Sequence, residues 1–109
     1  MGAPMAVSLD DLGVIANVTL SATANDVTEV TLPQFCNQMT VRFIGAAGKI
    51  ADTGVDGDPI GAVYLTVSAD TSAEIDLFNR PGNTARQVRY FASGTANTVV
   101  QILPVRSSL

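Results

Sequence analysis

The side chains that most often perform catalysis or bind transition metals are sparse in this chain. Histidine is absent and Cys36 is the single cysteine, so one chain alone cannot form a Ser-His-Asp triad, a Cys-His dyad or a zinc site with imidazole ligands. No sequence neighbour of Cys36 supplies a base or lowers its pKa, so we expect a structural thiol. We therefore predict a protein that is not an enzyme, with no catalytic residue, cofactor or resident metal.

Two groups of carboxylates leave alternatives open. Segment 52–58 holds three aspartates and two glycines, which suggests a Ca²⁺ loop, although it lacks the glutamate and the spacing of an EF-hand. Tight turns select the same residue types, and we expect a turn. The second group is Glu29, Glu74 and Asp76. Two of them would suit glycoside hydrolysis if neighbouring strands brought them together, but aromatic platforms are few, so we expect solvated charges.

The charge balance is acidic. The formal net charge is −4, and Lys49 is the only lysine. Nucleic-acid binding draws its affinity from several basic contacts to phosphates, so we expect neither nucleic acid nor an anionic membrane as a partner. No apolar run approaches the length that spans a bilayer, and the first residues lack the basic and apolar regions of a signal peptide. With one cysteine, a reducing intracellular origin is the simpler expectation.

Alternation of apolar and polar residues predicts the fold. It recurs in short segments that are separated by Gly, Pro, Asn and Asp, which is typical of strands half buried in a sandwich. At 109 residues the chain makes one domain. We predict an all-β, antiparallel, jelly-roll-like sandwich of seven or eight strands. The expected strands cover residues 14–20, 27–32, 39–44, 60–67, 73–77, 87–90 and 98–105, with 49–51 as a short one that continues strand 39–44.

The alternation also predicts which side chains point inward. The residues expected inside are Val14, Ala16, Val18 and Leu20; Thr28, Val30 and Leu32; Met39, Val41 and Phe43; Val63, Leu65 and Val67; Ala73, Ile75 and Leu77; Val88 and Tyr90. The last strand breaks the alternation, which predicts that it is covered on both faces.

The chain is expected to divide into an N-terminal arm and a sandwich. Residues 1–12 form the arm, with at most one helical turn capped by Ser8, and residues 13–109 form the sandwich. Apolar residues left on outer faces and on the unpaired arm are candidates for an interface. These candidate residues are Met5, Leu9, Leu12, Ile15, Ile44 and Val100.

Four segments resemble small virion proteins of tailed bacteriophages. They are VTEVTLP at 27–33, MTVRF at 39–43, GVDGDPIGA at 54–62 and FASGTANTVV at 91–100. The chain is similar, over roughly residues 27 to 105, to capsid decoration (cement) and head-associated jelly-roll proteins. The likeness lies in strand order and phrasing and includes no diagnostic motif.

This resemblance implies a structural protein of the virion, made in the host cytoplasm and placed on the capsid surface. The implied partners are the major capsid protein, whose neighbouring subunits it clamps, and further copies of itself, with a trimer favoured. A carbohydrate- or receptor-binding sandwich is the alternative. In that alternative, the 45–59 loop and exposed Tyr64 or Phe78 contact a sugar.

Overall fold

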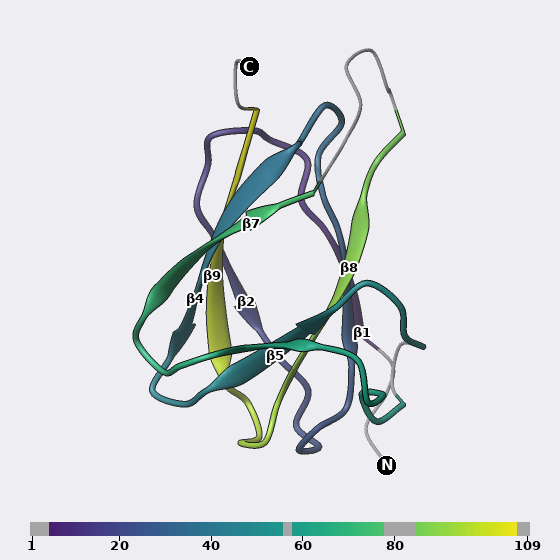
Figure 1. The fold of residues 1–109 in the computed structure, drawn as a ribbon, viewed down its shortest axis with the longest axis vertical. Coiled ribbons are helices and arrows are strands. Elements are labelled where there is room, and N and C mark those ends of the chain that lie inside the picture. The colour runs from purple at the N-terminus through teal and green to yellow at the C-terminus, as the bar shows by residue number, and fades with distance from the viewer. Residues whose placement is uncertain (1–4, 56–57, 78–84, 107–109) are drawn as a thin grey trace.

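The computed structural model of this chain describes residues 5–55, 58–77 and 85–106, which form nine strands and no helix (Figure 1). No helix in these residues is long and apolar enough to cross a membrane. The strands are β1 (Met5–Ser8), β2 (Ala16–Thr19), β3 (Thr28–Thr31), β4 (Gln38–Ile44), β5 (Gly48–Ala51), β6 (Leu65–Val67), β7 (Ser72–Asp76), β8 (Val88–Ser93) and β9 (Val99–Val105).

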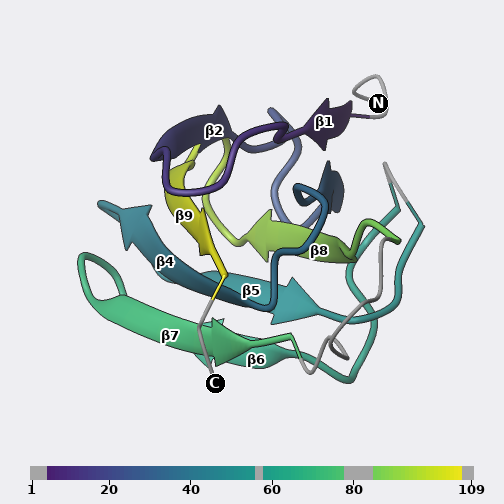
Figure 2. The same ribbon diagram turned by 90° about the horizontal axis from the view of Figure 1, so that it is seen from above.

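The strands form two sheets that face each other. The five-stranded sheet has the order β1-β3-β8-β5-β6, and the four-stranded sheet has the order β2-β9-β4-β7. Figure 2 shows the two layers from above, with β2, β9 and β4 on one side of the core and β3 and β8 on the other. The predicted β-sandwich is confirmed at this level.

The antiparallel pairings are nested from the outside inward. β2 pairs with β9, β3 with β8, β4 with β7 and β5 with β6. Among the eight strands β2 to β9, the last thus lies beside the first, and the next to last lies beside the second. The other two antiparallel pairs, β4 with β9 and β5 with β8, join these four strand pairs into the two sheets.

The core lies between the sheets and is mainly aliphatic. Inward-facing residues of β3, β4 and β9 are fully buried, including Val30, Val41 and Ile102. Burial of such a side chain contributes roughly 1.5–3 kcal/mol to the free energy of unfolding. The rings of Phe43 and Phe91 link the two sheets, with their centroids 6.2 Å apart. The inward faces predicted for segments 27–32, 39–44 and 73–77 are confirmed.

Strand β5 does not continue β4, contrary to the prediction. The chain turns at Gly45, whose φ of +78° suits a residue without a Cβ, and the Gly45 N–H donates to Asp70 Oδ1 at 3.0 Å. After this turn β5 enters the five-stranded sheet, while β4 stays in the four-stranded one. Alternation within a segment does not reveal this change of sheet.

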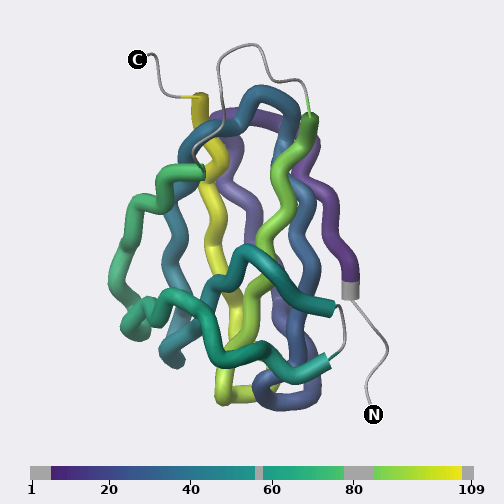
Figure 3. Tube along the Cα trace, turned by 45° about the vertical axis from the view of Figure 1, so that its right-hand side comes forward, coloured from purple at the N-terminus to yellow at the C-terminus, as the bar shows by residue number. Residues whose placement is uncertain are grey.

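The prediction for segment 60–67 was wrong over most of its length. Only Leu65–Val67 forms a strand, and Val63 and Leu65 are 86% and 50% exposed. The chain before β6 belongs to a long connection that runs outside the five-stranded sheet (Figure 3). There Val27 donates its N–H to the carbonyl of Asp58 at 2.9 Å. Val63 is therefore part of a surface loop.

The predicted faces of β8 are inverted. Tyr90 lies opposite Glu29 and Arg89 opposite Val30, and directly paired residues share one face of a sheet. Since Val30 is buried, Arg89 points toward the sandwich interior and Tyr90 points outward. Phe91, fully buried in the core, sets this register. Arg89 is accommodated because its Nε lies 3.2 Å from Asp52 Oδ1 at the end of the sheet.

Candidate interaction surface

The outward side of β9 and its neighbours forms an apolar strip on the four-stranded sheet. Val99, Leu103 and Val105 are half-buried there, because β9 lies between β2 and β4. Ile44, at the end of β4, is 38% exposed and lies opposite Val99. Ile15, directly before β2, is 60% exposed. We call Ile44, Val99, Leu103 and Val105, with Arg42 and Gln101 between them, the outer β9 face.

The placement of Val100 on an outer face was wrong. Val100, Ile102 and Pro104 all point into the core, and Val100 is fully buried between the sheets. The outward apolar side chains of β9 are its sequence neighbours. Apolar residues on both faces of β9 predicted that both faces would be covered. In the structure, the inward side chains of β9 are fully buried and the outward ones are half-buried. On the outward face, the partly exposed Val99 and Leu103 lie in place of Val100.

The N-terminal segment is a strand and not an unpaired arm with a helical turn. Residues Met5–Ser8 pair in parallel with Thr28–Thr31 of β3, as Figure 3 shows at the edge of the sheet. Leu9 follows and is buried in the core, so it cannot contact a partner while β1 is docked. Leu12, beyond it, is 37% exposed. Of the predicted interface residues whose side chains the structure describes, Leu12, Ile15 and Ile44 remain accessible. The side chain of Met5 lies outside that description.

Arg86 fastens this segment to the sheet. Its Nε donates to the carbonyl of Leu32 at 2.9 Å, and its Nη2 donates to the carbonyl of Leu9 at 2.8 Å. Nη2 also lies 3.1 Å from Asp10 Oδ1. One side chain therefore joins the ends of β1 and β3 to the start of β8. The sequence offers no signal for this contact, because its partners lie more than 50 residues away and two are backbone carbonyls.

Cys36 is buried in the core, as expected of a structural thiol. Its Sγ donates to the carbonyl of Gln38 at 3.3 Å. Burial raises the pKa of the thiol, because removal from water disfavours the thiolate more than the nearby hydrogen bonds and the charge of Arg89 favour it. A thiol in this state is a weak nucleophile at neutral pH.

The carboxylates that suggested chemistry are not gathered into a site by the described residues. Glu29 lies in the five-stranded sheet, whereas Glu74 and Asp76 lie in the four-stranded one. In segment 52–58, Asp52 pairs with Arg89, and Asp56 lies outside the described residues. No group of three or more His, Cys, Asp or Glu side chains able to hold a metal ion occurs in the part of the chain that the structure describes.

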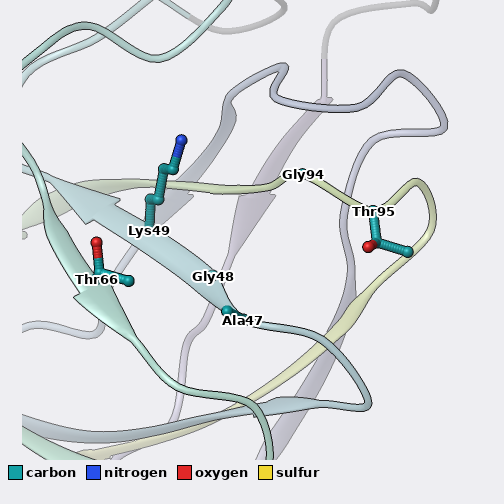
Figure 4. A pocket seen from close by; sticks show the side chains of 6 residues that line it. All are labelled: Ala47, Gly48, Lys49, Thr66, Gly94 and Thr95. Atoms are coloured by element: carbon teal, nitrogen blue, oxygen red, sulfur yellow. The ribbon is translucent and has the colours of Figure 1, made fainter.

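A second exposed region surrounds β6 and includes part of the 45–59 segment, one of the expected sugar contacts. An open hollow of about 390 Å³ is lined by Ala47, Gly48, Lys49, Thr66, Gly94 and Thr95 (Figure 4). Lys49 Nζ lies 4.7 Å from the ring centroid of Tyr64, a cation–π distance. One face of this ring is therefore occupied by an ammonium group and not open to a sugar. Phe78, the other expected sugar contact, lies outside the described residues.

Comparisons of the chain with known protein families, with curated proteins and with solved structures give no match.

Proposed function

We propose that this chain is a non-enzymatic structural protein of a tailed-bacteriophage virion. In this proposal it is a capsid decoration, or cement, protein that binds neighbouring copies of the major capsid protein and so stabilises the head. It works as a homo-oligomer, with a trimer favoured, on the capsid surface. The resemblance of four segments to such proteins suggests this assignment.

The nested strand pairing is the observation that carries the proposal. Eight strands in two facing sheets, with β2 beside β9, β3 beside β8, β4 beside β7 and β5 beside β6, follow the plan of a jelly roll. We therefore propose a jelly-roll fold, with β1 as an added edge strand. Capsid proteins are among the proteins built on this plan. A fold alone does not specify a function, so a surface must also support the proposal.

The outer β9 face supports an assembly role. It places Ile44, which is 38% exposed, opposite Val99, with Leu103 further along the same strand. Contiguous exposed apolar patches rimmed by polar residues mark sites of protein–protein contact. Arg42, exposed within the strip, adds a charge that orients a partner.

Quantitative mass spectrometry of purified virions tests the location. The proposal expects the chain at a copy number comparable with that of the shell protein. Its absence from virions, or a few copies per particle, would overturn the proposal.

Light scattering on the purified protein tests the oligomer. A trimer has three times the 11.3 kDa mass of one chain. Ile44→Glu should dissociate it, because assembly would bury a carboxylate against Val99, whereas Ala22→Glu, in an exposed turn, should not. A wild-type monomer at micromolar concentration contradicts the oligomeric part of the proposal.

A further inference from the structure

The hollow beside β6 combines a cation with hydroxyl groups and lacks any acidic side chain. Lys49 and Thr66 lie directly opposite each other on β5 and β6, so they share the outer face of the five-stranded sheet. Figure 4 shows both side chains rising from the same side of the sheet, with Gly94 and Thr95 across from them. None of the six lining residues is acidic. The hollow thus suits a negatively charged group.

Lys49 is held in position without a carboxylate partner. The ion pairs among the described residues join Arg86 to Asp10 and Arg89 to Asp52, and Lys49 takes part in neither. Its ammonium group instead rests against the ring of Tyr64. A carboxylate that binds Lys49 therefore displaces no ion pair among the described residues.

Strand β6 is also the open end of a sheet. The five-stranded order ends at β6, and no described strand pairs with its other edge. Its Leu65 points to the inner side of the sheet, opposite Ile50, yet is 50% exposed. An open edge with exposed apolar residues is a template for a further strand.

We propose that β6 binds an extended segment of a partner protein by strand addition, and that this segment carries an acidic residue between two apolar ones. Successive side chains of a strand point to opposite faces. An acidic residue placed beside Thr66 therefore shares the outer face with Thr66 and Lys49, and the long Lys49 side chain can reach its carboxylate across Thr66. Its apolar neighbours lie beside Leu65 and Val67 on the inner face. Backbone hydrogen bonds provide affinity and the side-chain pattern provides specificity. This inference does not rest on the proposed virion function.

A nuclear magnetic resonance titration of the intact protein tests the proposal. The probe is the peptide acetyl-Thr-Val-Glu-Val-Thr-amide, and the control probe replaces its Glu with Gln. We expect saturable shifts of the Leu65–Val67 and Lys49 amides at millimolar peptide, and binding about tenfold weaker for the Gln probe, as for loss of one charge-assisted hydrogen bond. No saturable shift, equal binding of the two probes, or shifts confined to other strands would each overturn the proposal.

Two variants separate the charge from the edge. Lys49→Gln should remove the difference between the two probes, while Leu65→Lys should weaken both, because a charge on an edge strand opposes pairing. Arg106→Gln removes one positive charge at the opposite end of β9 from the 94–97 turn and should bind both probes as the wild type does. A preference for Glu that survives in Lys49→Gln would refute the assigned role of the lysine. The titration uses the isolated protein and no virions, so a negative result would not contradict the virion proposal.

Discussion

Replacement of Gly48 by alanine should destabilise the sandwich through Phe43. A Cβ at Gly48 would overlap three ring atoms of Phe43, namely Cε2, Cδ2 and Cζ. The ring cannot move aside freely, because Phe43 is fully buried and packs against Phe91 on the opposite sheet. Gly48 therefore provides the space through which β4 and β5 pack across the core.

The cost follows from the geometry. Forcing an extra carbon into a filled core costs typically about 1–3 kcal/mol, and the lower flexibility of the unfolded alanine chain returns about 0.4–1 kcal/mol. We expect Gly48→Ala to lower the free energy of unfolding by about 1–2 kcal/mol. Gly61→Ala is the matched control, since a Cβ there meets nothing within 4 Å, and its free energy of unfolding should be unchanged or slightly raised.

Urea unfolding followed by far-ultraviolet circular dichroism measures these changes. Phe43→Leu shortens the side chain that the new Cβ meets, so the double variant should lose less stability than the sum of the single variants, with a coupling of about 1 kcal/mol. Additive losses, or equal stability of Gly48→Ala and Gly61→Ala, would refute this account of the core.

Three further predictions follow from single side chains. Thr28 is buried with no hydrogen-bond partner for its hydroxyl among the described residues, so Thr28→Val should raise the free energy of unfolding by about 1 kcal/mol; a loss in the same urea assay would mean that the hydroxyl is bonded. Arg86→Met removes two hydrogen bonds to carbonyls, and we expect amide hydrogen exchange in β1 to accelerate roughly 30-fold, for a local loss of about 2 kcal/mol, with β9 unaffected. Unchanged exchange in β1 would contradict the fastening role. Because burial raises the pKa of Cys36, the unfolded chain loses its thiol proton first as the pH rises, so stability should fall as the pH passes the ordinary pKa of a thiol, about 8.5. Cys36→Ala should flatten that slope, and identical slopes for the variant and the wild type would argue against it.

The sequence alone predicted the elements whose two faces differ clearly. Segments 27–32, 39–44 and 73–77 alternate over most of their length, and the structure places their predicted inward residues in or against the core. The physical reason is local: side chains of a strand alternate by geometry, so a half-buried strand must alternate in polarity. The absence of histidine likewise limited the possible chemistry without any knowledge of the fold.

The tertiary structure decided what depends on partners distant in the chain. Val100 is fully buried, whereas Val99 is only half-buried. Both residues are valines, so the residue type does not distinguish them; the pairing of β9 with β4 does. Arg89 turns inward because the burial of Phe91 sets the register of β8. The edge of β6 that no described strand pairs with exists because the five-stranded sheet ends there. Local sequence does not encode which strand lies at the edge of a sheet, and the proposed binding edge depends on β6 being that strand.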